Sequence, residues 1–110
     1  MHSYLLQATY SNQAWESLVG NPHNRLDAVR STIQDLGGSI SLSWMSFGEF
    51  NLVAILEMPD NASAIAFEYA CLAKNTLRAI QITPLLAMEE GVQAMQKAKA
   101  VGYDSPQKYK

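Results

Sequence analysis

Few residues of this chain have the type and spacing that catalysis or metal binding requires. Its two histidines, His2 and His23, are far apart, and no Asp or Glu stands at a metal-ligand interval from either. The single cysteine, Cys71, has no histidine near it in sequence, which favours a buried, unreactive thiol over a nucleophile. Gly37-Gly38 follows a helical pattern instead of opening one, which indicates a helix cap and not a phosphate loop. The sequence therefore predicts no metal and no cofactor, and it identifies no catalytic residue.

Ligand binding has more candidates than catalysis. Arg78 lies early in the last predicted strand, where its guanidinium could bind a ligand carboxylate or form an ion pair with Glu57 or Glu49. His23 is either a surface residue or a ligand and proton-transfer group. The aromatic side chains either pack in the core or line an apolar cleft between the helices and the sheet. The ligand-binding candidates are Trp15, His23, Trp44, Phe50, Asn51, Tyr69 and Arg78.

Composition narrows the classes of partner. The 110 residues suffice for one domain, and a net charge of −2 without a basic stripe argues against nucleic-acid binding. Apolar stretches fall well short of the roughly 20 residues that a membrane-spanning helix needs. One cysteine excludes an intrachain disulfide. With no secretory signal recognisable at the start, we expect a cytoplasmic protein that binds neither nucleic acid nor membranes.

Alternating and helical patterns predict the order of elements that must position these residues. Strands are expected at 3–10, 39–46, 51–58 and 75–86, and helices at 12–21, 22–36, 61–73 and 87–101. The order βαββαβ predicts an α+β, ferredoxin-like domain over residues 1–86, with a four-stranded antiparallel sheet and its helices on one face. The helix at 87–101 would pack on this domain or on a partner, and residues 102–110 would form a flexible tail.

Two of these elements allow the buried side to be predicted as well. The strand at 39–46 alternates, which would place Ile40, Leu42 and Trp44 on one face. The helix at 61–73 has an apolar stripe, and the residues expected on its buried side are Ala62, Ile65, Ala66, Tyr69, Leu72 and Ala73.

The strand at 51–58 is apolar on both sides, although the helices can cover only one face of the sheet. Leaving about four large aliphatic side chains in water would forgo about 6–12 kcal/mol, which is comparable to the stability of a small domain. Either the helix at 87–101 folds back over this face, or a second copy of the chain covers it. We favour a homodimer, with that helix at its periphery or reaching across to the partner. The interface candidates are Leu5, Leu52, Val53 and Ile55.

The segments RLDAVR at 25–30, LGG at 36–38 and GEFNLVAI at 48–55 together resemble the GYD-domain family of the dimeric α+β barrel superfamily. The resemblance covers about residues 3–90 and implies a homodimer in which two sheets face each other. It implies no particular reaction. The family has Gly-x-Tyr-Asp before an apolar strand, whereas this chain has Phe50 and Asn51, so a role that needs the acid is not carried over. No strand follows the literal Gly102-Tyr103-Asp104.

Three classes of function follow from these features. The first is a small homo-oligomeric module that is structural or holds a small apolar or aromatic molecule. The second, suggested by the superfamily, is a cofactor-independent monooxygenase or isomerase acting on an aromatic or polyketide-like compound. It would require His23, Tyr4, Tyr69 or Arg78 to face a cavity. The third is a regulatory protein that binds its partner through the helix at 87–101. We rank them in this order.

Overall fold

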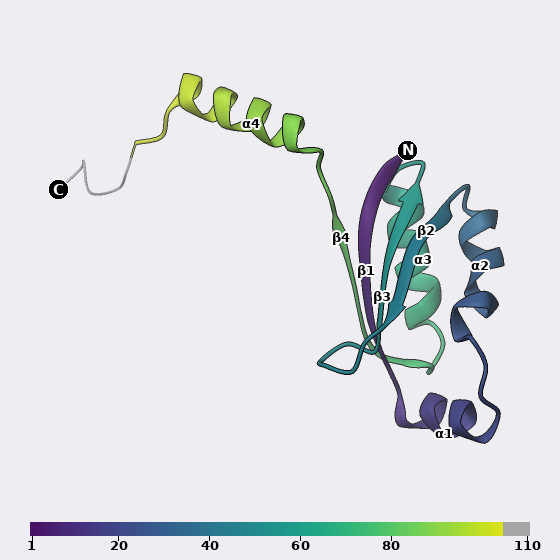
Figure 1. The fold of residues 1–110 in the computed structure, drawn as a ribbon. Coiled ribbons are helices and arrows are strands. Elements are labelled where there is room, and N and C mark those ends of the chain that lie inside the picture. The colour runs from purple at the N-terminus through teal and green to yellow at the C-terminus, as the bar shows by residue number, and fades with distance from the viewer. Residues whose placement is uncertain (105–110) are drawn as a thin grey trace.

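The computed structural model describes residues 1–104 and follows the predicted order of elements (Figure 1). The last six residues of the predicted tail, 105–110, lie outside the described part of the chain. The elements are β1 (His2–Tyr10), α1 (Asn12–Gly20), α2 (Arg25–Asp35), β2 (Ser39–Met45), β3 (Leu52–Met58), α3 (Asn61–Leu72), β4 (Leu77–Pro84) and α4 (Met88–Val101).

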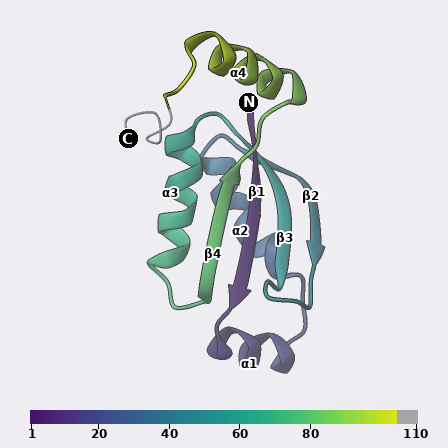
Figure 2. The same cartoon turned by 90° about the vertical axis from the view of Figure 1, so that its left-hand side faces the viewer.

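The four strands form one antiparallel sheet in the order β2-β3-β1-β4. This is the ferredoxin-like arrangement, in which the two central strands are the first and third along the chain. The strands lie in front of α2 in Figure 2, which views the face that α2 and α3 leave uncovered. The predicted fold class is confirmed, with α1 as an additional short helix between β1 and α2.

The core lies between the sheet and the helices α2 and α3. Alternate residues of β1 and β3 point into it, because the side chains of a strand alternate between its two faces. α2 contributes Ile33, and α3 contributes Ala64 and Phe67. The sheet residues in the same cluster are Tyr4, Leu6, Ala54, Leu56 and Met58.

The ends of the helices follow local sequence chemistry. The Asp60 carboxylate caps α3 by accepting a hydrogen bond from the Ser63 N–H at 2.7 Å, and this bond lowers the pKa of Asp60. Gly37, after the end of α2, has φ +83°, a left-handed conformation that glycine adopts without a Cβ clash. Beside it, a Cβ on Gly38 would lie 2.7 Å from the Glu57 carbonyl oxygen, so β2 can approach β3 only with glycine there.

The predicted buried side of α3 is wrong. Phe67 is 2% exposed, whereas Tyr69 is 64% exposed and points away from the sheet, as do Ile65 and Leu72. The helix buries Ala64 and Phe67 and half-buries Cys71, a stripe with spacings of three and four residues. Periodicity misidentified this face because α3 is apolar nearly all round, so its sequence has no polar side to mark the surface.

The prediction for β2 is also wrong, since Ile40 does not share a face with Leu42 and Trp44. The register of β2 against β3 shifts between Ile40, which pairs with Leu56, and Leu42, which pairs with Ile55. Ser41 is the extra residue of this irregularity, and its hydroxyl donates to the Ile55 carbonyl at 3.3 Å. One inserted residue moves every later side chain to the opposite face. Ile40 therefore packs on the core, and Leu42 and Trp44 lie on the other face.

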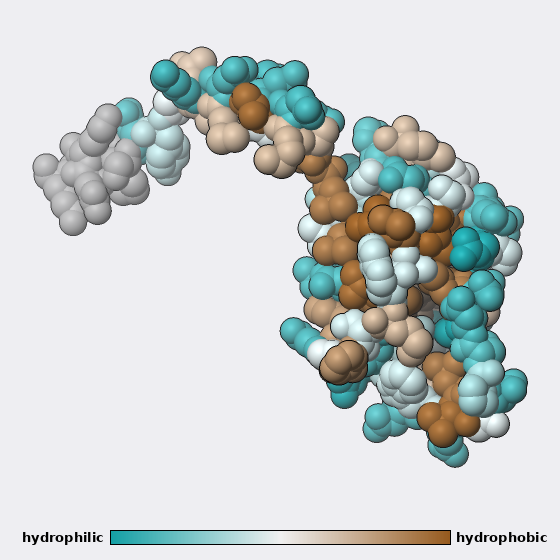
Figure 3. Space-filling view, in the orientation of Figure 1, coloured by the Kyte–Doolittle hydropathy of each residue, from teal (hydrophilic) through white to brown (hydrophobic). Residues whose placement is uncertain are grey.

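The uncovered face of the sheet is apolar on one half and polar on the other. The register places Leu42, Trp44, Val53, Ile55 and Leu5 on the part formed by β2, β3 and β1, where Gln7 lies beside Val53 and the Ser3–Glu57 pair lies at one end. At the β4 edge the same face carries Gln81 and Thr83. Figure 3 shows apolar residues exposed over the strands on this side of the molecule. We call this group of five apolar side chains the open sheet patch.

α4 does not fold back over its own sheet. None of its residues is buried, and it extends from the end of β4 away from the body, on the side opposite α2 and α3 (Figure 1). Met88, Val92 and Met95 form an exposed apolar stripe along it. Figure 3 shows teal side chains along its upper side and tan to brown ones beneath, toward the space beside the open sheet patch.

Candidate functional site

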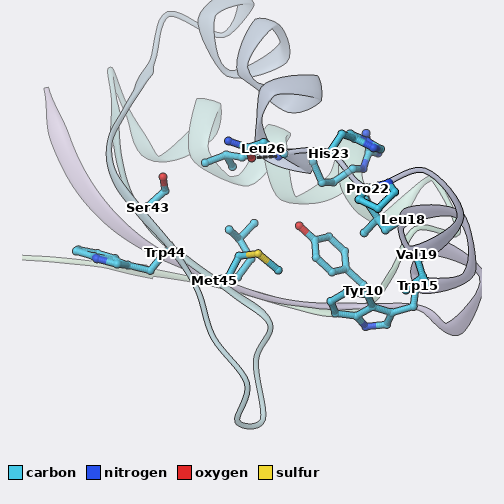
Figure 4. A pocket seen from close by; sticks show the side chains of 13 residues that line it. Tyr10, Trp15, Leu18, Val19, Pro22, His23, Leu26, Ser43, Trp44 and Met45 are labelled. Carbon is cyan, nitrogen blue, oxygen red and sulfur yellow. Dashed lines mark hydrogen bonds between the residues drawn. The ribbon is translucent and has the colours of Figure 1, made fainter.

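A cleft of about 700 Å³ opens between α1, the loop that joins α1 to α2, and the β2 edge of the sheet (Figure 4). Its walls are mainly apolar, and a few polar groups converge on it. The polar side chains come from Tyr10, His23, Asn24, Arg25 and Ser43. The apolar ones include Trp15, Trp44, Leu18, Leu26, Met45 and Leu52.

Local sequence chemistry separates α1 from α2 and so creates this opening. The Ser11 hydroxyl accepts from the Ala14 N–H at 3.1 Å and starts α1 directly after β1. Pro22 follows the end of α1, and the Asn24 side chain then starts α2 by accepting from the Leu26 N–H at 3.0 Å. The loop between the helices brings Pro22 and His23 to the rim of the cleft.

Tyr10 is the central polar residue of the cleft. Its side chain is only 7% exposed, and its hydroxyl points into the open space in Figure 4. The Tyr10 ring packs edge-on against the Trp15 ring, with centroids 5.3 Å apart. Within residues 1–104 its hydroxyl has no hydrogen-bond partner, although its backbone N–H does. Burial raises the pKa of Tyr10, and the nearby Arg25 guanidinium opposes this rise, so the phenol is neutral at physiological pH.

Asn51 holds the end of β1 on which Tyr10 stands. Its side-chain oxygen accepts from the Tyr10 N–H at 3.0 Å, and its own N–H donates to the Ala8 carbonyl at 2.8 Å. The Thr9 hydroxyl donates to the Glu49 carbonyl at 2.8 Å and ties the same loop to β1. An amide oxygen accepts this backbone hydrogen bond as a carboxylate would. Asn51 therefore makes this structural bond without needing a carboxylate.

His23 and Arg25 are the basic side chains of the cleft. The ring Nδ1 of His23 lies 2.7 Å from the Asn21 carbonyl oxygen, and since a carbonyl only accepts, Nδ1 carries the proton. This leaves Nε2 of His23 for another partner. No acidic residue lines the cleft. Among residues 1–104, Arg30 forms a salt bridge with Asp27 at 3.8 Å, whereas the Arg25 guanidinium pairs with no carboxylate.

The structure brings three predicted ligand-binding candidates to this cleft and places four elsewhere. Trp15, His23 and Trp44 line it, although the Trp44 indole points away from Tyr10 in Figure 4. Asn51 does not line the cleft but accepts a hydrogen bond from the backbone of Tyr10, which does. With Trp15 it lines a neighbouring shallow groove. The candidates outside both openings are Phe50, Tyr69 and Arg78.

Other predicted contacts of charged and titratable residues take a different form. Arg78 is exposed, and neither Glu57 nor Glu49 pairs with it in the described part of the chain. Glu57 instead accepts hydrogen bonds from the Ser3 hydroxyl at 2.8 and 2.9 Å. The Tyr4 hydroxyl lies in the core and donates to the Asn61 side chain. The enzymatic alternative needs one of four candidate residues in a cavity, and of these four His23 alone lines the cleft.

Sequence patterns do not identify Tyr10 and Arg25 as cleft residues. Tyr10 belongs to the core-facing set of β1, and the alternation there indicates only that its ring packs in the core. Arg25 does carry a signal, because it is the first residue of α2, where the helix dipole disfavours a positive charge. A cation at that position indicates that it serves another purpose.

Cys71 lies in the wall of a second, much smaller cavity that also touches Tyr10 and Arg25. The pKa of the Cys71 thiol is raised to about 11, mainly by burial, with Arg25 opposing the rise and Glu68 adding to it. We expect iodoacetamide at pH 8 to modify native Cys71 roughly a hundredfold more slowly than the urea-unfolded chain, because the thiolate is that much scarcer. Mass spectrometry of timed samples measures both rates. Equal rates would mean that the thiol is not buried as described.

Residues 1–104 lack two further kinds of feature. No group of three or more His, Cys, Asp and Glu side chains there is arranged to hold a metal ion. No helix in this part of the chain combines the length and the apolar content needed to cross a membrane.

Comparison with known proteins places the sequence in a family. The search among curated proteins finds no match. The family model described as the GYD domain matches residues 4–95, which include the sheet except the first two residues of β1, the cleft and the first part of α4. The chain therefore belongs to the GYD domain family.

Proposed function

We propose that this protein is a homodimeric module that binds a small apolar or aromatic molecule in the cleft beside Tyr10. The observation that carries the proposal is the cleft itself, about 700 Å³ with mainly apolar walls. Ligand pockets typically measure about 300–1,000 Å³ and combine apolar walls with a few converging polar groups. Trp15 offers an aromatic surface at this cleft, and Tyr10, His23 and Arg25 supply the polar groups.

Two exposed apolar surfaces support the homodimer. The open sheet patch and the α4 stripe of Met88, Val92 and Met95 lie on the same side of the sheet in the single chain. Soluble monomers rarely leave such surfaces in water. A second copy docked on the open sheet patch would meet the first copy's α4 as well, so each α4 would reach over the partner. Leu52 is not part of this interface, since it faces the helices and lines the cleft.

Binding to the cleft is tested with N-phenyl-1-naphthylamine, an uncharged aromatic probe whose fluorescence rises in apolar surroundings. We expect the protein to bind it and Trp15→Ala to weaken binding about tenfold, because the truncation removes one aromatic wall. Tyr69→Ala is the matched control, since Tyr69 is an exposed aromatic outside the cleft. A fluorescence titration gives the three dissociation constants. Equal affinity of Trp15→Ala and the unmodified protein would contradict binding at this cleft.

A further inference from the structure

We propose that the ligand of this cleft is an organic acid, with an apolar or aromatic body and one carboxylate that binds to Arg25 and the Tyr10 hydroxyl. The inference rests on the proposed binding function and adds the chemical class of the ligand. It depends on the charges and free hydrogen-bonding groups that converge inside the cleft.

The first argument is that the Tyr10 hydroxyl has no hydrogen-bond partner within residues 1–104, although the residue as a whole is only 7% exposed. No buried side-chain nitrogen or oxygen among residues 1–104 lacks a hydrogen bond, so this hydroxyl is open to water in the cleft. A ligand that displaces this water must offer the hydroxyl a hydrogen-bond partner of its own. The one open direction for this hydroxyl is the cleft, as Figure 4 shows. The phenol is neutral and therefore carries a proton to donate, which suits an acceptor on the ligand.

The second argument is charge. Arg25 lines both the cleft and the small cavity behind it, close enough to Tyr10 to affect its titration. Its guanidinium has no carboxylate partner among residues 1–104, and no Asp or Glu lines the cleft. His23 at the rim is not assigned to the carboxylate, because its Nδ1 already donates to the Asn21 carbonyl and Nε2 of the neutral ring only accepts. A guanidinium presents paired N–H donors that match the two oxygens of a carboxylate.

The third argument is the position of Arg25 at the start of α2. This helix has 11 residues, and the positive end of its dipole lies at the cleft. A cation there is unfavourable for the helix, and the one acidic residue of the first turn, Asp27, pairs with Arg30. A bound anion at the cleft would interact favourably with both Arg25 and the helix terminus.

The apolar remainder of the ligand follows from the rest of the lining. Apart from Arg25 and, at the rim, His23, the lining has no basic side chain, so a second negative charge beside Trp15, Leu18 or Leu52 would be desolvated without a partner. A molecule with several charges, such as a nucleotide or a sugar phosphate, therefore does not fit this cleft. A monocarboxylate on an aromatic or branched apolar skeleton does.

The test uses 1-naphthoate and 1-naphthamide as competitors that displace bound N-phenyl-1-naphthylamine. The two competitors have the same rings and nearly the same size, and they differ in charge. We expect 1-naphthoate to bind roughly ten- to a hundredfold more tightly than 1-naphthamide, as hydrogen bonds to a charged group suggest. Arg25→Gln should remove most of this preference and leave binding of the uncharged probe nearly unchanged. Tyr10→Phe should reduce the preference by a smaller factor.

Arg78→Gln is the matched control, because it removes an exposed arginine that lies outside the cleft. It should keep the preference of the unmodified protein for 1-naphthoate. If the uncharged probe binds but the two competitors are equal, the carboxylate inference is wrong and the proposed binding function stands. If the uncharged probe does not bind at all, the proposed function itself fails. A preference that survives Arg25→Gln would also overturn the assignment of the carboxylate to this arginine.

Discussion

Val53→Asp should dissociate the proposed homodimer into monomers. Val53 belongs to the open sheet patch and lies on β3 between Trp44 of β2 and Gln7 of β1. Facing a second sheet, the new carboxylate would lose its hydration without gaining a partner, and each dimer would contain two of them. An unpaired buried charge costs several kcal/mol, so the dimer dissociation constant should rise by about a thousandfold or more. Sedimentation equilibrium over a range of concentrations measures this constant.

The matched control is Ile65→Asp, which places the same carboxylate on the exposed outer side of α3. This variant should stay dimeric with an unchanged sedimentation profile. Far-ultraviolet circular dichroism of Val53→Asp checks that the single chain remains folded. A Val53→Asp protein that still dimerises as tightly as the unmodified one would exclude the open sheet patch as the interface. Insolubility of Val53→Asp with a normal Ile65→Asp would instead agree with an exposed patch that needs its partner.

Phe67→Ala should lower the free energy of unfolding by about 3–5 kcal/mol. The side chain is 2% exposed and packs in the core cluster with Leu6 and Ile33, so its removal leaves a cavity that the sheet cannot close. Small domains have only about 5–15 kcal/mol of stability, and this variant should therefore unfold at a markedly lower urea concentration. Urea titrations at equal protein concentration give the difference.

Tyr69→Ala is the informative companion, because helical periodicity assigns Tyr69 to the buried side and the structure exposes it. Its free energy of unfolding should stay within about 0.5 kcal/mol of the unmodified protein. If Tyr69→Ala were as destabilising as Phe67→Ala, the side of α3 that carries Tyr69 would have to pack against the sheet. The pair of variants thus tests the rotation of this helix directly.

The order and type of the elements could be read from the sequence because they depend on local patterns. Alternation in β1, the caps at Ser11 and Asp60, and the glycine after α2 each act within a few residues. The ferredoxin-like topology follows from that order with few alternatives. β4 is shorter at both ends than predicted, since alternation continues past the residues that pair with β1.

The cleft was only partly visible in the sequence. Trp15, His23 and Trp44 were candidates because of their residue types, but Tyr10 and Arg25 become important through position. The alternation of β1 predicts only that Tyr10 is a core residue. Its hydroxyl reaches a cleft because α1 and α2 are separated there. Arg78 was the more prominent arginine in the sequence, yet the fold leaves it outside the cleft.

The amino-acid sequence by itself determined the element order, the helix ends and the presence of a sheet strand with two apolar sides. Tertiary packing determined which side of α3 is buried and on which face Leu42 and Trp44 lie. It also determined which arginine lies close enough to Tyr10 to affect its pKa. The two groups of features differ in how far apart along the chain the interacting residues are. Caps and alternation are set by neighbours along the chain, whereas a one-residue shift in strand register or a rotation of a uniformly apolar helix is set by packing between segments tens of residues apart.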